Sequence, residues 1–154
     1  MIFVSFGNSP MPFRRLAQAV DDLAEQLDEE IIVQNGYTQY SFKYCKHFPF
    51  IGQLEYKEYL KNCSVAILQG GWGGISEASD IGCKIVAVPR IKGLEHYHDQ
   101  EQLVRELEKY DICLGCYDTG KLLDIVIKAR NYHFKPIVHG NASGIINEFI
   151  IKLL

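Results

Sequence analysis

The chain has 154 residues, of which 47% are apolar and 23% charged, a composition typical of one soluble globular domain. Its net charge is −3 and it has no cluster of Lys or Arg, which argues against nucleic-acid binding. No apolar run approaches the roughly 18 residues of a membrane-spanning helix. We therefore expect a single domain over residues 1–154.

The N-terminal half alternates between strand-like and helix-like segments. Residues 2–6 (IFVSF) are predicted to form a strand, and apolar residues at three- and four-residue steps predict a helix over 13–27. A strand over 30–34, an aromatic-rich extended stretch over 40–51 and a short helix over 53–62 follow. The N-terminus has no basic region or cleavage-site pattern, so we expect a cytosolic chain.

The C-terminal half continues the alternation. We expect strands over 64–69, 84–89 and 112–115, and helices over 75–81, 100–109, 119–131 and 142–153, with Gly82 as a helix C-cap. The runs VAIL and IVAV are apolar at every position, as in strands covered on both faces. This order predicts an α/β, Rossmann-like fold, a mostly parallel sheet with helices on both faces.

The five cysteines fit a reducing compartment better than a disulfide framework, because their number is odd and their spacing irregular. Cys113 and Cys116 form a C-x-x-C pair. However, a redox pair normally lies where a strand meets a helix, and a zinc site needs a second ligand pair. We interpret both as core or strand-end cysteines and expect no metal site.

Three loops are expected at the carboxyl edge of the sheet, where open α/β sheets bind ligands. They are residues 7–12, the glycine turn GGWGG at 70–74, and residues 90–100. Glycines that open a helix favour an anion such as a diphosphate, or they simply permit a tight turn. Neither standard nucleotide motif is present. No Gly-Lys-Ser/Thr follows the turn, and a G-x-G-x-x-G pattern from Gly71 ends at Ser76.

Two charged residues near these loops each allow two interpretations. Glu77 complements the helix dipole or accepts hydrogen bonds from ribose hydroxyls. Arg90 offsets diphosphate charge or makes a local ion pair. The sequence leaves both questions open.

The segments SFGNS, IVQNG, FPFI, AILQGGWGGISEASDIGCKIVAVPR and EHYHDQ resemble, in this order, the C-terminal donor-binding half of family 28 glycosyltransferases. The resemblance implies one half of a GT-B fold, a UDP-sugar donor and no metal or other cofactor. It also implies roles for particular residues. These are Gly7, Asn8 and Ser9 in the first phosphate-side loop, Phe50–Ile51 at the uracil, Gly71, Gly73, Gly74 and Ser76 at the diphosphate, Glu77 at the ribose, and Asp99 and Gln100 at the donor sugar and ribose.

The chain departs from the family pattern at Gln69, Trp72 and Asp99. Gln69 stands where relatives have His, Ser or Arg. Asp99 stands where His or Gln is common, so the identity of the donor sugar cannot be transferred from the relatives to this chain. Trp72 replaces a small residue, and its indole either packs in the turn or narrows the donor pocket. His96 and His98 are weak candidates for a catalytic or sugar contact, and in an extended segment they would not converge on one metal.

The resemblance implies a UDP-sugar-binding, catalytic subunit of a two-component inverting transferase that moves a hexose or N-acetylhexosamine to a lipid-linked acceptor in polysaccharide or oligosaccharide synthesis. A membrane-associated partner would supply the missing N-terminal half and the catalytic base, and would recruit the chain to the cytoplasmic face of the membrane. The apolar segment 142–153 would pack on this domain's own sheet or on the partner. Alternatives are a non-enzymatic UDP-sugar-binding or scaffold subunit and a fragment of a UDP-sugar epimerase.

Overall fold

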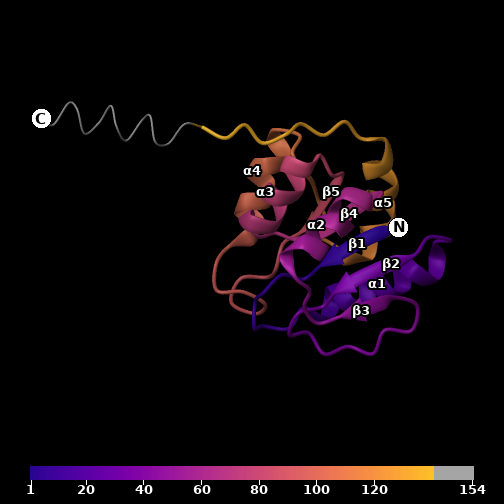
Figure 1. The fold of residues 1–154 in the computed structure, drawn as a ribbon. Helices are drawn as coiled ribbons and strands as arrows, with labels where there is room; N and C mark the ends of the chain where they lie inside the picture. The colour runs from indigo at the N-terminus through magenta and orange to yellow at the C-terminus, as the bar shows by residue number, and fades with distance from the viewer. Residues whose placement is uncertain (141–154) are drawn as a thin grey trace, which may run out of the picture.

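The computed structural model describes residues 1–140, and the helix expected over 142–153 lies outside them. Six parallel strands form one sheet in the order β3-β2-β1-β4-β5-β6 (Figure 1). This is the strand order of doubly wound nucleotide-binding folds. The predicted parallel sheet is therefore confirmed. The strands are β1 (Ile2–Ser5), β2 (Ile31–Gln34), β3 (Lys46–Phe48), β4 (Val65–Gln69), β5 (Ile85–Val88) and β6 (Leu114–Gly115).

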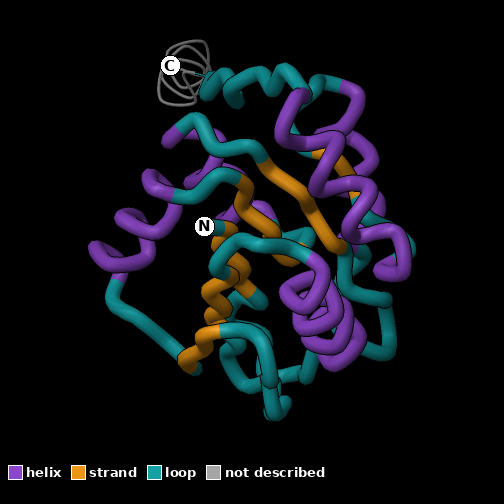
Figure 2. The backbone as a smooth tube through the Cα atoms, turned by 90° about the vertical axis from the view of Figure 1, so that its right-hand side faces the viewer, coloured by secondary structure: helices purple, strands orange, loops and turns teal. Residues whose placement is uncertain are grey.

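Helices cover both faces of the sheet (Figure 2). On one face lie α1 (Arg14–Gln26) and α5 (Leu122–Asn131), the latter preceded by a short 3-10 helix, η1 (Thr119–Lys121). On the other face lie α2 (Gln53–Asn62), α3 (Trp72–Ile81) and α4 (Gln100–Lys109). The consecutive strands and helices of the prediction are thus present in their expected order.

Alternating side chains of the central strands feed the two cores. In β1, Ile2 and Val4 pack under α1 and α5, whereas Phe3 packs toward α2 and α3. All four residues of β1 and of β5 are buried. Burial on both faces explains why these strands read as continuous apolar runs rather than as alternating ones.

The largest difference from the predicted boundaries concerns α3, which begins at Trp72 instead of Ile75. The first-turn N–H groups of a helix have no partner inside it, and tertiary context overrides the low helix propensity of glycine there. Gly73 and Gly74 therefore belong to the helix rather than to the loop before it. Gly82 ends α3 in the left-handed conformation (φ 86°), as predicted.

Cys113 and Cys116 are both buried free thiols. Burial raises the pKa of Cys113 to about 12 and that of Cys116 to about 11, so neither is a thiolate near neutral pH. These properties agree with core cysteines.

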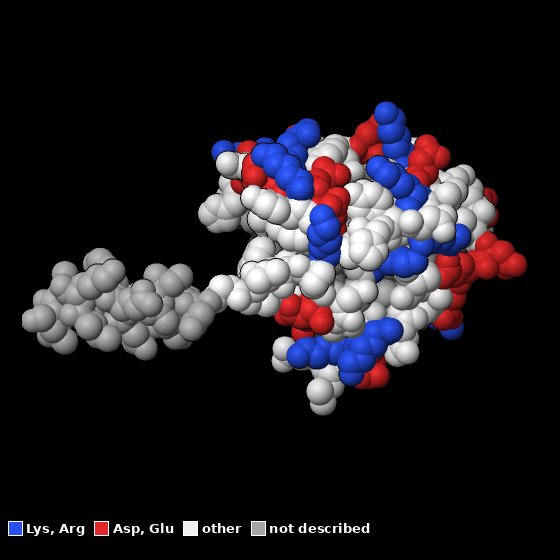
Figure 3. Space-filling view, turned by 90° about the horizontal axis from the view of Figure 1, so that it is seen from above, with Lys and Arg blue, Asp and Glu red and all other residues white. Residues whose placement is uncertain are grey.

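Acidic and basic side chains are interspersed on the face shown in Figure 3. Several of them form exposed ion pairs on helices, such as Glu101 with Arg105 (2.7 Å) on α4. Among residues 1–140, none of the helices combines the length and the apolar character that crossing a bilayer requires.

Candidate functional site

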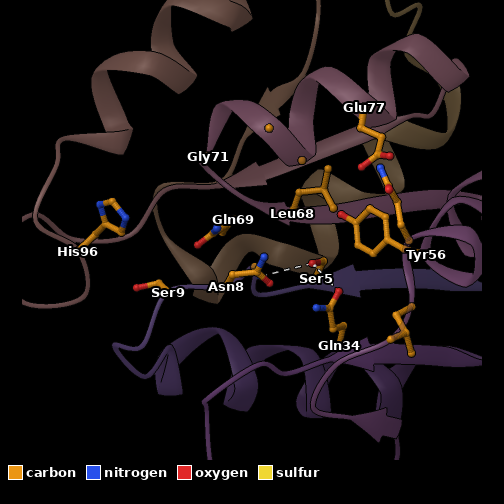
Figure 4. Close-up of a pocket in the computed structure, with 15 residues that line it drawn as sticks. Ser5, Asn8, Ser9, Gln34, Tyr56, Leu68, Gln69, Gly71, Glu77 and His96 are labelled. Carbon is orange, nitrogen blue, oxygen red and sulfur yellow. Dashed lines mark hydrogen bonds between the residues drawn. The ribbon is translucent and has the colours of Figure 1, made fainter.

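A cavity of about 660 Å³ lies at the carboxyl ends of β1 and β4 (Figure 4). These strands are neighbours, but their connections lead to opposite sides of the sheet, which makes this the topological switch point where α/β folds bind ligands. Predicted residues that line the cavity are Gly7, Asn8, Ser9, Ile51, Gly71, Gly73, Gly74, Glu77 and His96. Six further lining residues were not predicted: Ser5, Gln34, Gln53, Tyr56, Leu68 and Gln69.

The loop after β1 forms one wall of the cavity and depends on Gly7. This residue has φ 68°, and a Cβ on it would lie 1.9 Å from Nε2 of Gln69. Both the conformation and the space therefore require glycine. Its N–H donates to Oγ of Ser5 (3.3 Å), and the turn directs Asn8 and Ser9 along the cavity.

The four glycines of the 70–74 turn have different roles. A Cβ on Gly70 would lie 2.9 Å from Cα of Pro89 and 2.9 Å from Cγ2 of Val104, so Gly70 permits close packing against β5 and α4. Gly71, Gly73 and Gly74 line the cavity instead, and a Cβ on Gly73 would meet no atom within 4 Å. One glycine thus serves the fold, and three leave room at the site.

The N-terminus of α3 opens onto the cavity. Gly71 is its N-cap and makes no side-chain cap, so the N–H groups of Trp72, Gly73 and Gly74 have no partner within the helix. Unpaired amides at the positive end of a helix dipole bind anions. The wall formed by Gly71, Gly73 and Gly74 is therefore suited to a phosphate group.

Glu77 lies in the second turn of α3, rather than the first, because the helix begins at Trp72. The dipole effect on a carboxylate falls off after the first turn, so the dipole alone accounts poorly for this residue. Its carboxylate lines the cavity and lies 3.6 Å from Nζ of Lys57 on α2. It is partly exposed and can accept further hydrogen bonds from hydroxyl groups.

Tyr56, from α2, stands beside Glu77 in the cavity wall (Figure 4). Burial raises its pKa to about 12, and the nearby Glu77 charge acts in the same direction. Its hydroxyl lies 3.6 Å from where a Cβ on Gly74 would be. Tyr56 thus presents a neutral hydroxyl to the cavity between α2 and α3.

Polar side chains at the ends of β1 and β2 form the floor of the cavity. Oγ of Ser5 donates to Oε1 of Gln34 at 3.3 Å, and both residues are buried. The signal for them was present in the sequence, since each is the polar last residue of an apolar strand. Their side-chain direction depends on the strand register, which the sequence does not specify.

Arg90 connects the loops that surround the cavity, although it does not line it. It is 2% exposed, and its Nε donates to Oε1 of Gln69 at 2.7 Å. Its Nη atoms donate to the carbonyl oxygens of Phe6 and Met11, each at 2.8 Å. Burial lowers the pKa of Arg90 to about 10. The predicted local ion pair is not formed, because the direct partners of Arg90 are neutral oxygens, and the offset of diphosphate charge stays a prediction.

A second arginine, Arg15, also holds the loops that surround the cavity. The Glu95 carboxylate accepts from Nε of Arg15 at 3.0 Å rather than from Arg90, which contacts only the Glu95 carbonyl. Glu95 also accepts from the Ile91 N–H at 2.9 Å. The loop after β5 is therefore fixed to α1 and to the β1 loop through buried charges.

Five predicted site residues lie outside the cavity lining: Phe50, Ser76, His98, Asp99 and Gln100. Asp99 is the N-cap of α4 and accepts from the Gln102 N–H at 3.1 Å. Gln100 is buried, and its Oε1 accepts from the Arg90 N–H at 3.0 Å. In this structure Asp99 and Gln100 therefore organise the edge of the site, whereas Gly7 and Glu77 line it.

Trp72 corresponds to neither predicted arrangement. Its side chain is 49% exposed, so it is not buried in the turn, and it does not line the cavity. The expectation of a packed indole is wrong, because about half of the side chain is exposed.

His96 lines the cavity from the loop after β5. Its Nδ1 accepts from the His98 N–H at 3.0 Å, so a neutral ring carries its proton on Nε2 and is a hydrogen-bond donor there. Residues 1–140 contain no group of three or more His, Cys, Asp or Glu side chains arranged to hold a metal ion.

Solved structures with a similar fold are glycosyltransferases, and the chain matches about a third to a half of their length. They include the glycotransferase of kitacinnamycin (TM-score 0.66, 16% identity, 84% of this chain and 34% of that one) and the calicheamicin glycosyltransferase CalG4 (TM-score 0.64, 13% identity, 84% and 34%). MurG of Acinetobacter baumannii matches with TM-score 0.61 and 16% identity over 99% of this chain and 52% of its own. At these identities the likeness establishes the fold, one Rossmann-like half of the GT-B type.

Comparison with curated proteins by sequence gives no match. The family model of the glycosyltransferase family 28 C-terminal domain, however, matches residues 1–134, which is most of the chain. The match covers every strand of the sheet and all the residues that line the cavity. The chain therefore belongs to glycosyltransferase family 28, of which it carries the C-terminal domain.

Proposed function

We propose that this chain is the UDP-sugar-binding, catalytic subunit of a two-component inverting glycosyltransferase. The enzyme transfers a hexose or N-acetylhexosamine to a lipid-linked acceptor in polysaccharide or oligosaccharide synthesis. One observation carries the proposal. The free N-terminus of α3 and the Glu77 carboxylate share one cavity at the switch point of the sheet. An anion site beside a hydroxyl-accepting carboxylate suits a nucleoside diphosphate.

In the proposed complex the diphosphate lies against Gly71, Gly73 and Gly74 and accepts hydrogen bonds from the free amides of Gly73 and Gly74. Glu77 accepts hydrogen bonds from the ribose hydroxyls. The uracil lies near the backbone of Ile51, which also lines the cavity. The acceptor hydroxyl attacks the anomeric carbon from the face opposite the UDP, while a general base takes its proton. Negative charge developing on UDP is stabilised by the helix amides, so no metal is required in this scheme.

We assign the general base to the partner. Among the predicted candidates on this chain, His96 lines the cavity and His98 does not. The Nδ1 of His96 is already an acceptor for the His98 N–H, which leaves a proton on Nε2. This state suits a hydrogen-bond donor to the donor sugar or a phosphate better than a base.

The partner is proposed to be a membrane-associated chain that supplies the missing half and the lipid-linked acceptor, and that recruits this cytoplasmic subunit to the membrane. One observation supports a partner: large apolar side chains are exposed on segments that border the cavity. These are Phe50 (44%), Trp72 (49%), Leu94 (67%) and Tyr97 (76%).

Ligand-dependent thermal stability tests the donor assignment. UDP at 100 times its dissociation constant is expected to stabilise the chain by about 2.7 kcal/mol. Glu77→Ala should weaken UDP binding about 10- to 100-fold, the range for one hydrogen-bonded charged group. Glu58→Ala is the matched control, because Glu58 forms an exposed ion pair with Lys61 (2.8 Å) and does not line the cavity. Stabilisation by ADP or NAD but not by UDP contradicts the assignment.

A transfer assay separates the catalytic subunit from a non-enzymatic UDP-sugar-binding subunit. The chain is co-expressed with a candidate membrane-associated partner, and transfer from labelled UDP-sugars to lipid is measured. Loss of transfer in Glu77→Ala, with assembly retained, supports a catalytic subunit. Transfer that survives this variant unchanged contradicts the site, and transfer by the partner alone supports the scaffold alternative.

A further inference from the structure

Two cysteines meet at the amino-end edge of the sheet, opposite the proposed donor site. Cys63 is the C-cap of α2 directly before β4, and Cys83 follows the C-cap of α3 directly before β5. Each thiol donates a hydrogen bond to the same acceptor, the carbonyl oxygen of Leu60, at 3.2 Å. The two sulfurs therefore lie no farther apart than twice that distance.

The backbone of this edge suits a disulfide. The register of β4 and β5 pairs Ala66 with Ile85, and two residues earlier it sets Cys83 beside Ser64, one position from Cys63. Neighbouring strands are about 4.8 Å apart with a rise of about 3.3 Å per residue, so this offset gives a Cα separation of about 6 Å. Disulfides have Cα separations of about 4.4–6.8 Å.

The two thiols differ in acidity and in access. The proximity of the two sulfurs lowers the pKa of Cys63 and raises the pKa of Cys83, and burial raises the latter further. Both line a small cavity of about 140 Å³. Cys63 is partly exposed, whereas Cys83 is 8% exposed. Cys63 is thus the more accessible and more readily ionised sulfur, with a second thiol within reach to resolve an oxidised intermediate.

We propose that Cys63 and Cys83 form a reversible disulfide, a redox modification site on the edge of the sheet away from the cavity. With a hydroperoxide as oxidant, the Cys63 thiolate attacks the peroxide oxygen and becomes a sulfenic acid, releasing water when the peroxide is hydrogen peroxide. The Cys83 sulfur then displaces the sulfenic hydroxyl as a second water. In total, two thiols lose two electrons and two protons, and one peroxide is reduced to two waters.

The disulfide would close a covalent loop that contains β4, the glycine turn and α3. A crosslink that joins the two ends of this unit restricts the unfolded chain and raises thermal stability. The inference does not depend on the proposed function, because it uses no residue of the donor cavity.

Peptide mapping of the full chain tests the pair. Trypsin cleaves after Lys61 and Lys84, so one peptide, residues 62–84, contains both cysteines. After treatment with hydrogen peroxide and alkylation of free thiols, this peptide should lack two hydrogens and carry no alkyl group. Dithiothreitol should restore both alkylation sites. When the protein is unfolded in denaturant for the alkylation step, Cys45, Cys113 and Cys116 should still be alkylated. Burial raises their pKa values to about 12, 12 and 11 in the folded chain and so protects them from the peroxide.

Variants extend the test. Oxidation should raise the melting temperature of the wild type and of the control variant Cys45→Ser, but not that of Cys63→Ser or Cys83→Ser. In Cys83→Ser, the Cys63 sulfenic acid should accumulate and react with dimedone. Three outcomes in the peroxide-treated wild type would each overturn the proposal. The 62–84 peptide could gain oxygen instead of losing two hydrogens, it could be linked to another chain, or both of its cysteines could be alkylated.

Discussion

Arg90 sets the orientation of the Gln69 carboxamide, which faces the cavity. The Nε of Arg90 donates to Oε1 of Gln69 at 2.7 Å. Because arginine has no acceptor, this contact requires the oxygen of Gln69 and leaves its nitrogen pointing toward Gly7. A buried cation that does not touch the cavity thereby places an N–H donor in the cavity wall (Figure 4).

Gln69→Glu should separate this polar contact from the proposed anion site. The carboxylate keeps an acceptor for Arg90, so the free energy of unfolding should stay the same or increase. A new negative charge beside the diphosphate should weaken UDP binding about 100-fold, since two unit charges about 5 Å apart interact by roughly 3 kcal/mol at an effective dielectric constant of 20. Isothermal titration with UDP and urea unfolding measure the two effects.

Gln102→Glu provides the control for net charge. It makes the same chemical change at an exposed position on α4 that does not line the cavity. UDP affinity should be unchanged in this variant. An equal loss of affinity in both variants would mean that overall charge, and not the place of Gln69, determines the effect.

Gly70 and Gly73 should respond differently to alanine. A Cβ on Gly70 overlaps Pro89 and Val104, so Gly70→Ala should lower the free energy of unfolding by about 1–3 kcal/mol. Gly73→Ala meets no protein atom and replaces glycine in a helix, so stability should be kept or slightly raised, by up to about 1 kcal/mol. The same methyl group should weaken UDP binding, because Gly73 lines the cavity.

Urea unfolding and UDP titration of both variants check this division. Gly70→Ala that is as stable as the wild type would show that the packing around Gly70 adapts. If Gly73→Ala leaves UDP affinity unchanged, the phosphate does not bind at this part of the N-terminus of α3.

The parallel sheet with helices on both faces was predictable because apolar strands alternate with amphipathic helices along the chain. The start of α3 was not, since glycine has a low helix propensity and no local pattern indicates that Gly73 and Gly74 belong to the helix. The predicted strand over 112–115 is shortened to Leu114–Gly115, which pair with Val86 and Ala87 of β5.

The candidate site was predictable where it depends on strand ends, and less so where it depends on side-chain direction. The loop that contains Gly7 follows from its place after the first strand at the edge of the sheet, whereas the role of Glu77 was implied by the family resemblance. Asp99 received a donor-facing role by resemblance, yet its carboxylate caps α4. Tyr56 was missed because its position in the cavity wall results from the packing of α2 on α3, which no local pattern encodes.

Asp99→Ala distinguishes a structural from a ligand-binding role. Loss of the hydrogen bond to the Gln102 N–H should lower the free energy of unfolding by about 1 kcal/mol. UDP affinity should not change, because Asp99 does not line the cavity. Asp99→Asn keeps a good N-cap and should restore stability. If Asp99→Asn restores stability but UDP-sugar binding is weakened in both variants, the carboxylate contacts the donor.

Tyr56 should make the fold sensitive to alkaline pH. Its pKa is raised by burial to about 12 in the folded chain, against about 10 in an unfolded one. Between pH 10 and 12 the unfolded chain therefore releases a proton that the folded chain retains, and this difference lowers stability as the pH rises. The loss reaches about 2 kcal/mol near pH 11.5 and is absent below pH 9. Tyr56→Phe should reduce the alkaline loss of stability by this amount, as measured by urea unfolding at pH 9 and 11.5.

Tyr97→Phe, at a position that is 76% exposed, is the control. Equal alkaline losses in the wild type and Tyr56→Phe would mean that the Tyr56 hydroxyl ionises as freely in the folded chain as in the unfolded one, and that it is not the neutral donor assigned to the cavity wall.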